Sequence, residues 1–113
     1  MKNFKKGDIV IALTNPLNKY CQSRIKGKSY TVNDVMYCCN CGIQAINIGV
    51  KSYHILVSCK CGSSQSNKGL EWTNSIHFIK VDDLEFGIES ALKEEDYELA
   101  IILRDFKIDL IEN

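Results

Sequence analysis

Cys38-Cys39-Asn40-Cys41-Gly42 and Cys59-Lys60-Cys61-Gly62 are the two stretches that decide how this chain folds. Each places closely spaced thiols immediately before a glycine. Two such turns can offer four thiolates in a tetrahedron around one ion, as in a zinc ribbon. The sequence therefore predicts a small module stapled by a structural zinc ion, whose ligands are Cys38, Cys41, Cys59 and Cys61.

The first cluster holds three cysteines, so its spacing does not decide which two of them bind the ion. Cys38 and Cys41 have the C-x-x-C spacing, which we favour, whereas Cys39 and Cys41 repeat the C-x-C spacing of the second cluster. The adjacent pair Cys38-Cys39 would also suit capture of a soft ion such as Cu(I) or Cd(II) by a metal sensor or chaperone. An even count of six cysteines keeps disulfides open as a further alternative.

The chain lacks the features of an exported or membrane protein. No apolar run follows the first lysines, and no stretch approaches the roughly 18 apolar residues that a membrane span requires. We therefore expect a cytoplasmic protein that does not insert into membranes. In that reducing compartment, cysteines are usually free or bound to metal.

Short apolar runs on both sides of the cysteine clusters predict strands. The expected strands are Ile9–Leu13, a second from Gly27 through Val32 to Tyr37, a hairpin of Gln44–Gly49 with Tyr53–Ser58, and a closing strand at Ile76–Ile79. Several short strands at this spacing are typical of a small barrel.

The stretches Phe4-Lys5-Lys6-Gly7-Asp8-Ile9-Val10 and Gly27-Lys28-Ser29-Tyr30-Thr31-Val32 resemble the opening of Src-homology-3 (SH3)-like barrels, in which a Gly-Asp turn precedes the first strand. The resemblance implies an SH3-like β-barrel that carries the zinc-ribbon hairpin as an insertion. Because such barrels host many unrelated functions, the fold alone assigns none.

The last third of the chain has helical periodicity. Asp82 and Glu85 have the spacing of a capping box, so we expect a first helix to begin there. Gly87 within it either lowers the stability of the helix modestly or lets another segment approach the helix closely. A second helix is expected from about Tyr97 to Ile111. The predicted fold class is α+β: the barrel followed by an antiparallel helical hairpin. The apolar stripe of the first helix is Leu84, Ile88, Ala91 and Leu92, and that of the second is Leu99, Ile102, Leu103, Phe106 and Leu110.

The stretch from Leu84 to Leu110 resembles the UVR motif, the helical hairpin of the bacterial excision-repair proteins UvrB and UvrC. The likeness rests on Ala91, on Glu95-Asp96-Tyr97-Glu98-Leu99-Ala100 and on Leu103-Arg104-Asp105; Ile101 and Lys107 depart from the family pattern. Zinc knuckles joined to such a hairpin are also similar to the activators of bacterial protein-arginine kinases. The resemblance implies a hairpin that docks on another hairpin or on a partner protein, in DNA repair or a stress response. Arg104 and Asp105 would make its polar contacts, and Tyr97, Ala100 and Leu103 would lie at the packing seam.

Charge divides the chain near Val81. Residues 1–80 carry eleven Lys and Arg against three Asp and Glu, whereas residues 81–113 carry three against eleven. This asymmetry predicts a basic module over 1–80 and an acidic one over 81–113. The basic module could bind nucleic-acid phosphates and stack bases on Tyr53 or Trp72, with the acidic hairpin as a competitor. The candidate residues for this role are Lys26, Lys28, Lys51, Lys60, Lys68 and Trp72.

Motifs that would indicate an enzyme are missing from the sequence. It has no Ser/His/Asp grouping, phosphate-binding glycine loop or close carboxylate pair with a base. Cys21, His54 and His77 are interpreted as structural residues. We therefore expect a non-catalytic zinc-binding adaptor whose hairpin binds a protein or a second copy of the chain; the alternative is a nucleic-acid-binding module gated by its acidic hairpin.

Overall fold

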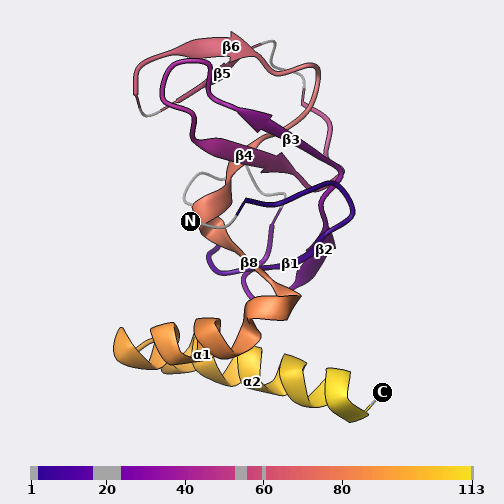
Figure 1. Ribbon diagram of the computed structural model, residues 1–113, viewed down its shortest axis with the longest axis vertical. Coiled ribbons are helices and arrows are strands. Elements are labelled where there is room, and N and C mark those ends of the chain that lie inside the picture. The colour runs from indigo at the N-terminus through magenta and orange to yellow at the C-terminus, as the bar shows by residue number, and fades with distance from the viewer. Residues whose placement is uncertain (1–2, 17–23, 53–55, 60, 113) are drawn as a thin grey trace.

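The computed structural model describes residues 3–16, 24–52, 56–59 and 61–112, which form small antiparallel sheets and a helical hairpin (Figure 1). The α+β class is therefore confirmed. The strands are β1 (Ile9–Ala12), β2 (Ser29–Thr31), β3 (Asp34–Tyr37), β4 (Gln44–Asn47), β5 (Leu56–Ser58), β6 (Ser64–Ser66), β7 (Thr73–Asn74) and β8 (Phe78–Lys80). The helices are α1 (Leu84–Lys93) and α2 (Tyr97–Glu112), with short 3-10 turns η1 (Ser75–His77) and η2 (Val81–Asp83).

The first sheet has β1 at its centre, in the order β2-β1-β8, and β1 separates two cores. Because side chains alternate along a strand, Val10 and Ala12 face one side and Ile11 faces the other. Val10 and Ala12 pack with Phe4, Val32, Ile46 and Phe78, whereas Ile11 packs with Ile79 and the helices. Burial on both faces explains why this strand reads as a continuous apolar run.

The other strands form two further sheets, in the orders β3-β4-β7 and β5-β6. The predicted pairing of Gln44–Gly49 with Tyr53–Ser58 is wrong. β4 pairs with β3 and β7, β5 pairs with β6, and Tyr53, His54 and Ile55 lie outside the described residues. Over the part of the chain that the structure describes, the three sheets do not close into a barrel, so the predicted SH3-like barrel is not confirmed.

The helical hairpin forms as predicted, with one difference at its start. The residue at the N-cap of α1 is Asp83 rather than the predicted Asp82, and the Asp83 side chain makes no capping hydrogen bond. At α2 the cap is present: the Asp96 carboxylate accepts a hydrogen bond from the amide of Leu99 at 3.2 Å. This cap satisfies one of the amides that the first turn of α2 leaves unpaired.

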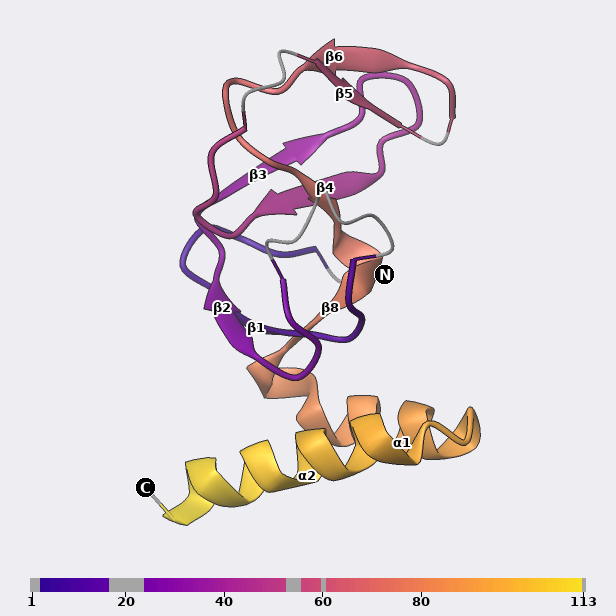
Figure 2. The same cartoon turned by 180° about the vertical axis from the view of Figure 1, so that it is seen from behind.

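The hairpin lies across one end of the β-rich part, and the β5–β6 hairpin lies at the opposite end (Figures 1 and 2). Ile11 and Ile79 of the sheet share an apolar core with Leu84 and Leu103 of the helices. An ion pair of 3.3 Å between Lys26 and Asp96 also joins the helical hairpin to the β-rich part. The charge boundary near Val81 falls in η2, which connects β8 to α1. None of the described helices is both long enough and apolar enough to cross a bilayer.

Candidate metal centre

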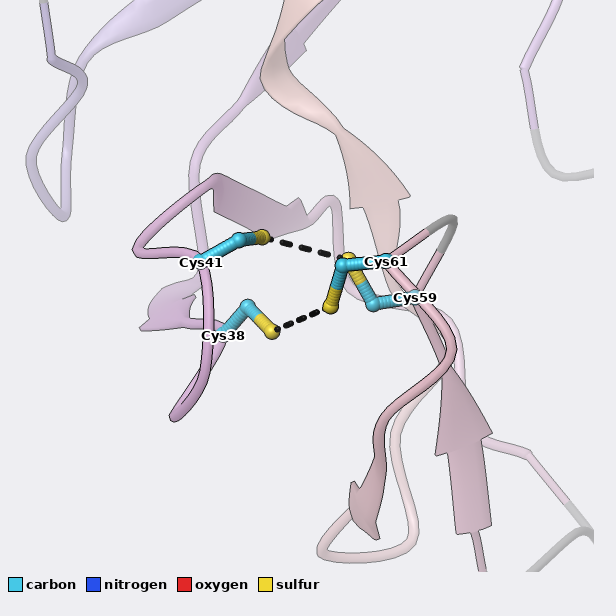
Figure 3. Close-up of side chains that lie close together, drawn as sticks. All are labelled: Cys38, Cys41, Cys59 and Cys61. Carbon is cyan, nitrogen blue, oxygen red and sulfur yellow. Dashed lines mark hydrogen bonds between the residues drawn. The ribbon is translucent and has the colours of Figure 1, made fainter.

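Four cysteines from two turns meet (Figure 3), in the part of the molecule around β3 to β6 that lies away from the helices (Figure 1). Cys38 and Cys41 lie in the turn between β3 and β4, and Cys59 and Cys61 in the turn between β5 and β6. The sulfur atoms of Cys38 and Cys61 lie 3.6 Å apart, and those of Cys41 and Cys59 lie 3.5 Å apart. All four Sγ atoms lie within 4.8 Å of one another. These are the four cysteines predicted from spacing.

Local hydrogen bonds give each turn its shape. In the first turn the Cys38 amide donates to the Ile43 carbonyl at 2.9 Å, and the Gly42 amide donates to the Cys38 carbonyl at 3.0 Å. The second turn repeats this between Gly62 and Cys59 at 2.9 Å. Gly42 and Gly62 have φ angles of 76° and 94°, which favour glycine. The glycine after each cluster therefore lets the chain reverse while both thiols stay on one side.

The geometry of the sulfurs suits a tetrahedral ion. A metal–sulfur distance of about 2.3 Å implies sulfur–sulfur edges of about 3.8 Å in a regular tetrahedron. The edges of 3.5 and 3.6 Å are close to that value. They are far longer than the ~2.05 Å of a disulfide bond. The described cysteines are therefore free thiols, and four of them could hold one metal ion.

Neighbouring polar groups favour the thiolate form of two of these cysteines. Hydrogen bonds from the Ser63 hydroxyl, and then from the Asn40 amide, lower the pKa of Cys61 to about 5. The backbone amide of Cys41, followed by the Ser63 hydroxyl, lowers the pKa of Cys38 to about 7. The Ser63 oxygen lies 3.0 Å from the Cys38 sulfur and 3.1 Å from the Cys61 sulfur, so its single proton can serve one of them at a time.

Cys41 shows the opposite shift. The amide of Ile43 favours its thiolate, but partial desolvation and the neighbouring sulfurs of Cys59, Cys38 and Cys61 outweigh this and raise the pKa of Cys41 to about 12. Crowding of like charges disfavours a further thiolate in the absence of a cation. A bound cation would reverse that repulsion.

Cys39 stands apart from the quartet. It is exposed, and its backbone amide donates to the side-chain oxygen of Gln65 at 3.0 Å. This hydrogen bond ties the first turn to β6. The C-x-x-C pair Cys38 and Cys41, rather than the C-x-C pair, thus enters the cluster.

The structure divides the residues predicted to bind a partner between surface and core. Tyr97, Arg104 and Asp105 are exposed, whereas Ala100 and Leu103 are buried in the chain's own core, 6% and 0% exposed. A protein that meets the folded hairpin would therefore contact the first three and not the last two.

The lysines proposed to bind nucleic acid differ in exposure and in their ion pairs. Lys28, Lys51 and Lys68 are exposed, Lys26 pairs with Asp96, and Lys60 lies outside the described residues, as does Cys21. The Trp72 indole is half-buried and donates to the Asn67 carbonyl at 2.9 Å. The ring of His77 lies 3.0 Å from the hydroxyl of Thr14.

Two supporting residues escaped the sequence analysis, namely Ser63 and Asn40. Ser63 follows the second glycine and Asn40 lies between two cysteines, so adjacency to the clusters was the available signal. Comparison with known proteins assigns no relationship: no family model, curated protein or solved structure matches this chain.

Proposed function

We propose that this protein is a non-catalytic zinc-binding adaptor, in which the zinc ion braces the β-module and the helical hairpin docks on a protein partner. The observation that carries the proposal is an apolar stripe on the outer face of α2. Tyr97, Ile101 and Ile108 are 59%, 50% and 44% exposed. With Arg104 they follow the spacing i, i+4, i+7 and i+11, which places them on one face of the helix.

The stripe is separate from the residues that fold the hairpin. Leu99 and Leu103 lie on the opposite face of α2 and are buried against α1 and the sheet. The hairpin therefore folds without burying the outer stripe. Exposed apolar side chains that share one helix face and surround a single arginine are typical of protein interaction surfaces.

Charged side chains beside the stripe favour a specific interaction over non-specific hydrophobic association. Glu98 and Asp105 are exposed next to it, and Arg104 lies at its centre. Arginine presents several donors in a planar fork, so it can fix the orientation of a partner's carboxylate. The sequence of the hairpin resembles the UVR motif, and the proteins that carry this motif use it for docking. This resemblance supports the same role.

Zinc would be held by Cys38, Cys41, Cys59 and Cys61 and would supply structural cross-linking. A complete set of four thiolates leaves no open coordination position for a substrate, which is the arrangement of structural rather than catalytic zinc sites. The ion would fix the turn of the β3–β4 hairpin to that of the β5–β6 hairpin.

The proposal can be tested with a photo-crosslinking amino acid placed in the full-length, zinc-loaded protein. At Ile101, in the stripe, we expect an adduct of defined mass from an extract of the source cells. At Glu89, exposed on α1, we expect no adduct of that mass. Arg104→Glu should abolish the adduct while leaving the circular dichroism spectrum unchanged. The same adduct at both positions, or one that survives Arg104→Glu, would show that α2 does not dock as proposed.

A further inference from the structure

A second apolar surface lies between α1 and the β-rich part. It is a groove of about 840 Å³ that includes Phe86, Ser90 and Glu94 on its helical side and Ile76 and Phe78 on its other side. Phe86 and Ser90 of α1 and Glu94 at its C-cap recur at intervals of four, so one side of the helix forms a continuous wall. None of Tyr97, Ile101, Arg104 and Ile108 lines the groove, so it is distinct from the outer stripe of α2.

Two large apolar side chains on opposite walls remain open to solvent. Phe86 is 70% exposed and Ile76 is 52% exposed, although both line the groove. Between them the groove reaches Ile79, which is buried in the core shared by helices and sheet. An apolar ligand lying here would remove both side chains from water and rest on a preformed base.

The charges around the groove select the ligand. Among the described residues that line it are the carboxylates of Asp83, Glu94 and Asp96 and one ammonium, that of Lys80. That ammonium already lies 3.5 Å from the carboxylate of Asp8, and Asp96 already pairs with Lys26. The described side chains that line the groove thus carry more carboxylates than ammonium groups, and Glu94 lies at the C-terminal end of α1, where the helix dipole adds negative potential.

We propose that this groove binds a basic amphipathic helix of a partner protein. The wall from Asp83 to Glu94 extends for about 16 Å at 1.5 Å per residue, which matches roughly three turns of a helix laid beside α1. The ligand's apolar face meets Phe86 and Ile76, and its lysines or arginines meet the carboxylates, as in other helix-in-groove complexes. The protein then has two docking surfaces, as bridging between partners requires.

The test uses nuclear magnetic resonance of the zinc-loaded, full-length protein labelled with nitrogen-15. One probe is a synthetic 14-residue amphipathic helix of leucine and lysine, and the other has glutamate in place of every lysine. The lysine peptide should shift the amide resonances of Phe86, Ser90 and Ile76, and the glutamate peptide should not. Phe86→Ala and Glu94→Lys should each weaken the binding by about tenfold or more.

Matched controls are available on the same helix. Leu92 is half exposed and Glu89 is exposed, and neither lines the groove, so Leu92→Ala and Glu89→Lys should leave the affinity unchanged. Absence of binding, equal binding of both peptides, or equal effects of Phe86→Ala and Leu92→Ala would overturn the proposal. Concentration-dependent shifts at these residues without peptide would also overturn it, since the occupant would then be a second copy. Arg104→Glu should not affect this assay, so its outcome is independent of the proposed docking by α2.

Discussion

Gly87 of α1 lies against Ile79 of β8, so closely that a β-carbon on residue 87 would come within 2.6 Å of the Ile79 Cδ1 atom. The same β-carbon would lie 3.2 Å from Cδ1 of Leu103 on α2. Glycine is thus the residue that lets α1 approach the sheet and α2 at once. This contact, rather than a flexible linker, sets how the hairpin sits on the β-rich part.

The first prediction concerns that contact. Gly87→Ala should gain about 1 kcal/mol of helix propensity but lose more to overpacking, with a net destabilisation of about 1 kcal/mol in urea unfolding. Ile79→Val deletes the Cδ1 atom that the new methyl would meet. In that background the cost of Gly87→Ala should largely disappear, a coupling of about 1 kcal/mol. Ile11→Val, another strand isoleucine of the same core, is the matched control and should show additivity. Additivity for both valine variants would refute the contact.

The second prediction assigns the ligands. Replacing Cys38, Cys41, Cys59 or Cys61 by serine should lower the metal content, measured by elemental analysis, from one ion per chain towards zero. Cys39→Ser should keep the ion, because that thiol lies outside the cluster and only its backbone amide ties it to Gln65. Loss of metal in Cys39→Ser, together with retention in Cys38→Ser, would show that the C-x-C pair binds instead.

The third prediction concerns removal of the metal. Among the described strands β5 and β6 pair only with each other, and a cavity of about 200 Å³ lined by Met36, Ala45 and Val57 separates them from β3 and β4. The sulfurs and the hydrogen bonds of Gln65 with Cys39 and Tyr37 join the two hairpins. A chelator should therefore increase amide hydrogen exchange in β5 and β6 by at least about tenfold, while the amides around Leu103 stay protected. Equal loss of protection in α2 would mean that the ion holds the whole fold together.

Local periodicity predicted where helices and strands form better than it predicted which strands pair. The apolar spacing along α2 gave Tyr97 to Ile111, and the helix covers Tyr97–Glu112. The pairing of β4 could not be found in this way, because one of its neighbours, β7, is the two-residue strand Thr73–Asn74, which has no periodicity to detect. Strand pairing depends on contacts distant in sequence, and a hairpin assumed from adjacency misses them.

The candidate metal site was predictable because spacing alone limits how two turns can present thiols. Its hydrogen-bonding surroundings were not, because the role of Ser63 depends on β5 and β6 bringing it between Cys38 and Cys61. Ala100 likewise lies outside the apolar stripe predicted for the second helix, and its burial depends on the core that α2 shares with Ile11 and Ile79 of the sheet.

The fourth prediction concerns pH. Lys107 of α2 donates a hydrogen bond to the carboxylate of Glu85 on α1, and this bond, with the charge of Lys107, lowers the pKa of Glu85 below its ordinary value of 4.5. A lowered carboxyl pKa stabilises the folded state above pH 4.5, and that stabilisation is lost as pH falls through the folded-state pKa. Carbon-13 titration should show the Glu85 pKa returning to about 4.5 in Lys107→Met. Lys93→Met, on the same helix as Glu85, should leave it low; an equal rise in both variants would contradict the pairing.

The fifth prediction concerns Asn47, which is 0% exposed at the end of β4 and uses both ends of its amide. Its nitrogen donates to the carbonyls of Val50 at 2.8 Å and Glu71 at 2.7 Å, and its oxygen accepts from the Asn33 side chain and the Gly49 amide, each at 2.9 Å. Asn47→Asp keeps the shape but removes both donors and places a charge beside two carbonyls, so it should cost at least about 3 kcal/mol in urea unfolding. Asn15 is the matched control, since its side-chain oxygen accepts from the Lys26 amide and Asn15→Asp preserves an acceptor there. If the two variants were equally stable, the buried amide could not be what joins β4 to the segments around Val50 and Glu71.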